Sequence, residues 1–127
     1  MGKTKRRKLR IVAALAALLA VAVLMVWRVW FPGREFDPAV WRDEVQVQDG
    51  VRLGMADRLL ARRSLLGRTR AEVVAVLGEP PPTGYFADWD MVYWLGLERG
   101  WIRIDSEWLV LRLGKDGRVV DGRIVRD

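Results

Sequence analysis

Two pairs of carboxylates are the first residues whose types and spacing could support chemistry. Asp88 and Asp90 form one pair, Asp105 and Glu107 form the other, and one residue separates the members of each. Paired carboxylates can carry out acid–base catalysis or bind calcium. Both pairs lie at the boundaries of predicted strands, where acidic side chains commonly do no more than solvate a turn. We therefore favour a structural role for both pairs.

A serine nucleophile is the other catalytic candidate, because Ser106 directly follows Asp105. Such a serine needs a neighbouring base that accepts its proton. The chain has no histidine and no cysteine, and Lys115 is the only lysine beyond the N-terminal basic cluster. These absences also remove disulfides, thiolate chemistry and the usual zinc ligands. The sequence predicts a protein that is not an enzyme and that uses neither a metal nor a cofactor.

Tryptophan is unusually abundant, with seven in the chain. Four of them fall in the region predicted to form strands, namely Trp89, Trp94, Trp101 and Trp108. Side chains alternate between the two faces of a strand, so the leucines of segment 107–113 share one face while Trp108, Val110 and Arg112 share the other. In segment 101–104, the same alternation separates two isoleucines from Trp101 and Arg103.

This alternation predicts a surface for binding a partner. If the aliphatic face of the sheet covers the helices, tryptophans and arginines lie on the outer face, and these residue types dominate interaction hot spots. The predicted partner-binding residues are Trp94, Trp101, Arg103, Trp108 and Arg112. The alternative is that a small core simply uses large rings.

Five arginines surround the two predicted helices: Arg58, Arg62, Arg63, Arg68 and Arg70. They could form a patch for an anion or a lipid headgroup. A solvated helical face explains them as well, and we favour that interpretation.

The N-terminal segment has the composition of a membrane span. Residues 11–27 contain no charge, and after Arg28 the apolar sequence continues to residue 31. Roughly 20 apolar residues suffice to cross a bilayer, and an arginine at the end of such a helix can extend to the headgroups. Three aromatic residues resemble an interfacial belt: Trp27, Trp30 and Phe31. We predict a basic tip over residues 1–10 and a transmembrane helix over residues 11–31, with the lipid bilayer as its partner.

A cleaved signal peptide is the alternative to this anchor, because Ala20-Val21-Ala22 matches the pattern of a cleavage site. Residues 23–27 after that site stay apolar, which favours an uncleaved anchor. Six basic residues precede the span, while acidic and basic residues mix on its other flank. The N-terminus should therefore stay in the cytoplasm, with the C-terminal domain on the far side of the membrane.

The distribution of charge argues against nucleic-acid binding. The chain has 22 basic and 16 acidic residues, but seven of the basic ones precede or lie within the apolar segment. The remaining 15 basic residues face 16 acidic ones, which gives the folded part a net charge of −1. Such a domain lacks the positive charge that dominates affinity for DNA and RNA. A protein is the partner that suits it better.

Beyond the span, the sequence predicts a tether and then two helices. Residues 32–50 show no sustained helical period, and we interpret them as a tether. Apolar residues between Arg52 and Arg63 have the spacing of one helix face. Thr69 and Glu72 form a capping box that starts a second helix, which Gly78 and the prolines after it end.

The rest of the chain is strand-like. Four segments are rich in aromatic and branched residues: 91–95, 101–104, 107–113 and 118–125. A glycine-containing turn over residues 114–117 should join the last two into an antiparallel hairpin. Helices that precede strands indicate an α+β domain over residues 51–127, with two short helices on a three- to four-stranded antiparallel sheet.

Several motifs resemble one known family. The predicted helices contain LGRTRAEV at 66–73 and LGEP at 77–80, and the strands contain YWLG at 93–96, IDSEWLV at 104–110 and DGRV at 116–119. These motifs resemble those of the BamE (SmpA/OmlA-like) domains. The resemblance implies two helices on an antiparallel sheet, similar also to β-lactamase inhibitor proteins, and a role in protein–protein contact within the bacterial envelope. Subunits of this family carry a lipidated cysteine, which this chain lacks.

Two functional hypotheses follow from the sequence. The first is a bacterial inner-membrane protein whose periplasmic domain binds another envelope protein, as an accessory to envelope or outer-membrane protein assembly. The alternative is a membrane-tethered sensor or inhibitor domain that binds a small envelope ligand or an enzyme. That alternative requires a pocket ringed by Tyr85, Phe86 and Trp89.

Overall fold

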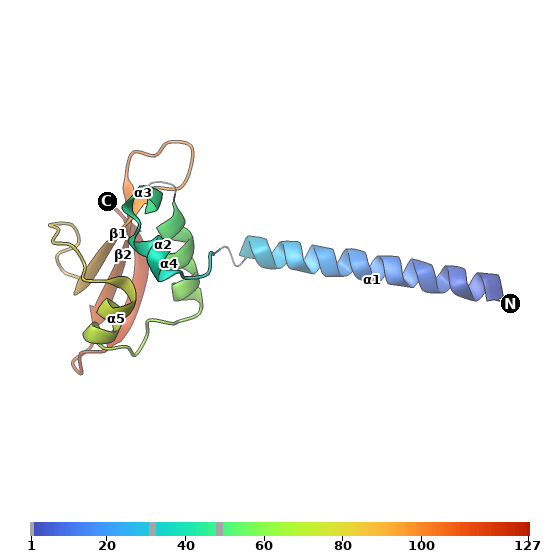
Figure 1. The fold of residues 1–127 in the computed structure, drawn as a ribbon, viewed down its shortest axis with the longest axis horizontal. Coiled ribbons are helices and arrows are strands. Elements are labelled where there is room, and N and C mark those ends of the chain that lie inside the picture. The colour runs from blue at the N-terminus through green and yellow to red at the C-terminus, as the bar shows by residue number, and fades with distance from the viewer. Residues whose placement is uncertain (1, 31–32, 48–49) are drawn as a thin grey trace. The chain divides into compact units, whose positions relative to one another are not determined.

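The computed structural model describes residues 2–30, 33–47 and 50–127 (Figure 1). The chain divides into two compact units, Met1–Pro32 and Gly33–Asp127. Each unit is described by itself.

The first unit is one long helix, α1 (Gly2–Trp30). The most apolar 18-residue stretch within its segment Thr4–Trp27 has a mean hydropathy of 2.7, and none of that stretch is buried. The helix is therefore long and apolar enough to serve as a membrane span or signal anchor, as predicted. It begins at Gly2, so the predicted basic tip continues the same helix. Phe31, the last residue of the predicted span, lies outside the described residues.

The second unit is an α+β domain, which confirms the predicted fold class. Its sheet has three antiparallel strands in the order β1-β2-β3: β1 (Met91–Leu97), β2 (Ser106–Leu113) and β3 (Val119–Arg126). Where two helices were predicted, the described residues contain four: α2 (Pro38–Arg42), α3 (Glu44–Val47), α4 (Val51–Ala61) and α5 (Arg70–Leu77). In Figure 1, α4 lies on one side of the sheet and the segment between α5 and β1 extends on the other.

The predicted signals at the ends of α5 are confirmed. The Glu72 N–H donates to Thr69 Oγ1 over 3.2 Å, and the Thr69 N–H donates to Glu72 Oε2 over 3.3 Å, which completes the capping box. Gly78 follows the helix with φ +85°, a conformation that glycine adopts readily. The turn over residues 114–117 is also present, with a hydrogen bond of 2.9 Å from the Gly117 N–H to the Gly114 carbonyl.

The core lies between the helices and the inner face of the sheet. Leu109 and Leu111 are fully buried there, together with Met91, Tyr93 and Leu95 of β1. The helices contribute Leu53, Met55, Leu59, Val73 and Leu77. The predicted alternation of β2 holds in part, because Leu109 and Leu111 face the core while Trp108 is half-buried and Arg112 is exposed. Val110 lies on the same face as Trp108 and Arg112, yet it is fully buried, so part of this face is covered.

The segment interpreted as a tether packs into the domain from Gly33 onward. Trp41 of α2 is only 1% exposed, and its Nε1–H donates to the Leu77 carbonyl over 3.0 Å. Arg52 donates to the carbonyls of Trp41 (2.6 Å) and Trp94 (3.1 Å), which joins this segment to β1. The helices α2 and α3 have five and four residues, too few for a sustained apolar period to mark them in the sequence.

The strand predicted over residues 101–104 is absent. The register of β1 and β2 pairs Leu97 with Ser106, so residues 98–105 form the loop that joins these strands. Ile102 and Ile104 therefore have no sheet face to share, and the alternation argument does not apply to Trp101 and Arg103.

Candidate docking surface

The outer face of the sheet carries the residues expected there by alternation along β1 and β2. Trp94 and Trp108 are direct cross-strand partners, and Arg112 lies opposite Asp121 of β3. Both tryptophans are half-buried and Arg112 is exposed. Cross-strand partners on one face lie within side-chain contact, so Trp94 and Trp108 adjoin each other. Val110 lies between Trp108 and Arg112 on this face and is fully buried.

Two aromatic rings from the segment between α5 and β1 cover part of this face. The Tyr85 ring lies 5.2 Å from the Trp108 ring between centroids, at an angle of 30°. The Phe86 ring lies 6.3 Å from the same indole and meets it edge-on, at 61°. Tyr85 remains 54% exposed, so the three rings form a cluster that is open to solvent on one side.

Trp89 packs against the arginines of the same face. Its ring lies 4.4 Å from the Arg112 guanidinium carbon and 5.8 Å from that of Arg123. Arg123 also forms a salt bridge of 2.9 Å with Asp121. Stacking of guanidinium groups on an indole stabilises both in a defined orientation while the charges stay near water. The outer face therefore presents rings and cations in a fixed arrangement.

Asp127 fixes the edge of the Trp108 indole. Its carboxylate accepts hydrogen bonds from the Ser106 N–H (2.8 Å) and from Trp108 Nε1–H (3.1 Å). These donors, Ser106 first, lower the pKa of the Asp127 carboxyl below its ordinary value. Because the indole N–H already has a partner, the Trp108 side chain has no other polar group to offer.

The outer-face residues Trp94, Trp108 and Arg112, with Tyr85, Phe86, Trp89 and Arg123, are called the aromatic–arginine face below. Sequence reasoning assigned the first three to it. Tyr85, Phe86 and Trp89 were predicted to ring a pocket. In the structure they contact side chains of the sheet instead. These three residues lie outside the strands, in the segment between α5 and β1. The alternation of side chains along a strand therefore could not predict their position.

Trp101 and Arg103 lie apart from the aromatic–arginine face. They belong to the loop over residues 98–105, which projects from the end of the sheet (Figure 1, orange). Trp101 is fully exposed, and the Arg103 Nε–H donates to the Glu98 carbonyl over 3.2 Å. The five predicted partner-binding residues are thus divided between two surfaces.

One member of each carboxylate pair has a structural partner. Asp90 Oδ2 accepts the Leu113 N–H over 2.7 Å, which joins the residue before β1 to the end of β2. Glu107 is 2% exposed, and its carboxylate accepts the Arg99 Nε–H over 3.0 Å. Within the described ranges, no three acidic, histidine or cysteine residues are placed to hold a metal ion.

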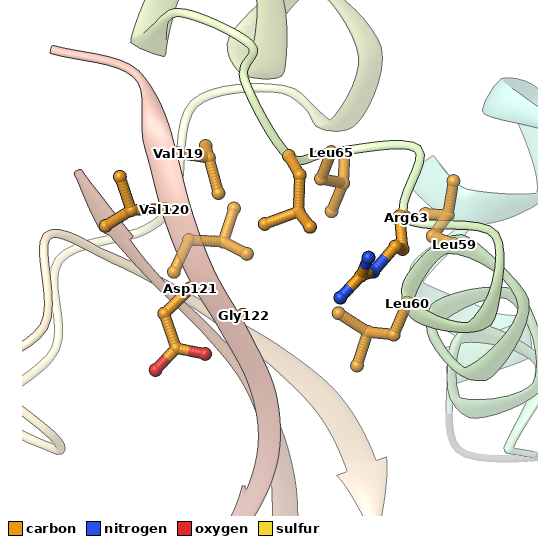
Figure 2. A pocket seen from close by; sticks show the side chains of 10 residues that line it. Leu59, Leu60, Arg63, Leu65, Val119, Val120, Asp121 and Gly122 are labelled. Carbon is orange, nitrogen blue, oxygen red and sulfur yellow. The ribbon is translucent and has the colours of Figure 1, made fainter. Parts of the chain in front are cut away.

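A small cavity lies on the helix side of the sheet, away from the aromatic–arginine face. Figure 2 shows residues of α4 and the turn after it facing β3 across this space. Its lining comprises Leu59, Leu60, Arg63, Leu65, Leu66, Leu111, Val119, Val120, Asp121 and Gly122. Its volume of about 230 Å³ lies below the roughly 300–1,000 Å³ of typical small-molecule sites.

No protein-family model, curated protein or solved structure matches this chain.

Proposed function

We propose that this chain is a membrane-anchored interaction module that docks another cell-envelope protein through its aromatic–arginine face. The observation that carries the proposal is the ordered layer of rings and guanidinium groups on the outer face of the sheet, with Tyr85 and Arg112 open to solvent. Tryptophan, tyrosine and arginine are the residue types enriched in hot spots of protein interfaces.

Charge and rigidity support a protein as the partner. The folded unit is close to neutral, so it lacks the excess of positive charge on which binding to nucleic acids depends. Trp89 and Trp108 are already oriented by Arg112 and Asp127. Ordering side chains before binding lowers the entropic cost of association.

The finer proposal concerns location. α1 would cross the bacterial inner membrane with the N-terminus in the cytoplasm and the domain in the periplasm, because six basic residues precede the apolar segment. The motifs that resemble BamE domains support a role accessory to envelope or outer-membrane protein assembly. An alkaline phosphatase reporter fused after Asp127 should then be active. Activity of a cytoplasmic reporter at that position, or a mature chain that begins near Val23, would reject this topology.

The docking proposal is tested by substitution on the exposed part of the face. Full-length chain carrying Arg112→Glu should recover much less of a crosslinked partner from intact membranes than wild type, because the change reverses a charge and removes the stack on Trp89. Lys115→Glu is the matched control, since Lys115 is an exposed cation in the turn after the same strand. Equal recovery with both variants would reject the face as the docking site.

A second candidate function is a sensor or inhibitor domain for a small envelope ligand. The cavity of Figure 2 favours it, because leucines line this cavity while Arg63 supplies a polar group. Its volume makes it the weaker candidate. A ligand in this space should be lost when Leu60→Phe fills it, whereas docking on the opposite face should persist.

A further inference from the structure

The loop between β1 and β2 exposes an apolar tip. Trp101 is 104% exposed, Ile102 69% and Ile104 78%, relative to each residue type in an open chain. Three large apolar side chains on one short loop are unusual on a soluble surface, where such clusters mark a contact with a membrane or a protein. None of them contributes to the core.

The base of this loop is fixed. Arg99 donates to Glu107 Oε2 over 3.0 Å and to Asp57 Oδ2 of α4 over 2.6 Å. The hydrogen bonds to Glu107 raise the pKa of the Arg99 guanidinium, so it stays charged. The Glu98 N–H also donates to the Asp105 carbonyl over 2.8 Å. These ion pairs and hydrogen bonds therefore fix the base of the loop that carries the apolar tip.

The first residues of the folded domain, Gly33 and Arg34, contact the same stretch of α4. The Arg34 N–H donates to the Gly54 carbonyl over 2.9 Å, and a Cβ on Gly33 would lie 2.9 Å from Arg58 Cβ. Gly54 and Asp57 are three residues apart, which is about 4.5 Å along a helix. The entry of the chain and the base of the loop are thus attached within one helical turn of each other.

The connection between α1 and this entry point is short. Only residues 31 and 32 separate the end of α1 at Trp30 from Gly33. A chain spans at most about 3.5 Å per residue, so this connection can bridge roughly 11 Å. If α1 crosses a bilayer and ends at its surface, chain length alone limits Gly33 to roughly this distance from that surface.

We propose that the loop over residues 98–105 inserts Trp101, Ile102 and Ile104 into the interfacial region of the bilayer that α1 spans. Tryptophan favours this region because its ring is apolar and its N–H can reach water. Two acidic and two basic residues in the loop cancel in charge. Insertion therefore depends on apolar burial and is insensitive to anionic lipid.

This second membrane contact orients the domain. One anchor and a short connection leave a domain free to rotate about its attachment, whereas two contacts restrict it to a narrow range of orientations. The proposal rests on α1 as a membrane span, and it is independent of which partner the aromatic–arginine face binds.

Lipid-borne quenchers test the proposal on the full-length chain. The natural sequence contains no cysteine, so Trp101→Cys accepts a single environment-sensitive fluorophore. The labelled chain is reconstituted into phosphatidylcholine vesicles with or without lipids spin-labelled near the headgroup. Lys115→Cys, in the turn at the other end of β2, is the matched exposed control. Leu18→Cys on α1 reports separately whether the anchor is inserted.

The lipid quenchers should reduce fluorescence at position 101 several-fold more than at position 115, and iodide in the aqueous phase should do the reverse. Replacing part of the phosphatidylcholine with phosphatidylglycerol should change neither result. Ile102→Asp with Ile104→Asp should lower lipid quenching at position 101 to the control value.

Equal quenching at positions 101 and 115, with position 18 quenched, would overturn the inserted loop while leaving the anchor intact. Protection of position 101 from iodide without quenching by lipid would assign the tip to a protein contact or a second copy of the chain, and would also overturn the proposal. Absence of quenching at position 18 would reject the anchor itself.

Discussion

The two faces of one sheet differ in what covers them. On the inner face, Leu109 and Leu111 are fully buried beneath helices. On the outer face, Trp108 and Arg112 are covered only in part, by rings from a single segment. Leu111 and Arg112 are neighbours in the chain, yet one is buried and the other is exposed. The division is not complete, because Val92 and Val110 lie on the outer face and are buried as well.

The chemical types on each face match this division. Aliphatic side chains on the inner face gain stability from removal from water and from dense packing. Indoles and guanidinium groups on the outer face interact through ring and cation–π contacts, which contribute less to folding and tolerate solvent. Substitutions on the two faces should therefore have different consequences.

The largest effect is expected on the inner face. Leu111→Ala should lower the free energy of unfolding by about 2–5 kcal/mol, because it leaves a cavity among closely packed residues. Denaturant unfolding of the full-length chain in detergent, followed by tryptophan fluorescence, measures this loss. A loss no greater than that caused by Arg112→Ala, one residue further on, would remove the distinction between the faces.

Trp108→Ala tests the outer face. Partner affinity should fall by about 2 kcal/mol, the size of a typical hot-spot loss, while the domain stays folded. The cost in unfolding free energy should stay below that of Leu111→Ala, because the indole is half-buried. If both variants proved equally destabilising, and the indole were inaccessible to acrylamide, Trp108 would belong to the core.

Thr69→Ala tests the helix layer that covers the inner face. Loss of the hydroxyl that accepts the Glu72 N–H should cost about 1 kcal/mol of unfolding free energy. Thr83→Ala is a suitable control, because the Thr83 hydroxyl accepts the Tyr85 N–H in the segment over the outer face. An unchanged melting midpoint for Thr69→Ala would show that the capping box does not stabilise α5.

Arg112→Ala should have the smallest effect on folding. The stack of its guanidinium on Trp89 is worth roughly 0.5–1 kcal/mol at a solvent-exposed site. Thermal unfolding of the full-length chain measures this difference, and Arg112→Lys should recover part of it. A loss comparable to that of Leu111→Ala would mean that the segment over the outer face is part of the structural core.

Local signals in the sequence predicted much of the fold. The capping box at Thr69 and the turn over residues 114–117 involve residues close in the chain, and both are present. The alternation along β2 is present for the leucines, Trp108 and Arg112, whereas Val110 is buried on the outer face. The apolar helix was likewise evident from composition. Each of these features depends on residues close in the sequence or on the spacing of apolar residues along one helix or strand.

Features that depend on distant partners were not predicted. Trp41 lies in the core because Leu77 accepts its N–H from 36 residues away, and no local pattern marks that contact. Segment 101–104 has the composition of a strand, but β2 already pairs with β1 on one side and β3 on the other. The covering of Trp108 by Tyr85 depends on the path of a proline-rich segment that has no helical or strand period.

Site-specific photo-crosslinking tests the docking face most directly. A photoreactive amino acid replaces either Tyr85, on the aromatic–arginine face, or Val120, beside the cavity of Figure 2; the two are 54% and 57% exposed. In intact cell membranes, full-length chain with the probe at position 85 should form a discrete crosslink to one envelope protein, and the probe at position 120 should not. A crosslink from position 120 alone, or equal crosslinks from both, would contradict docking through the aromatic–arginine face.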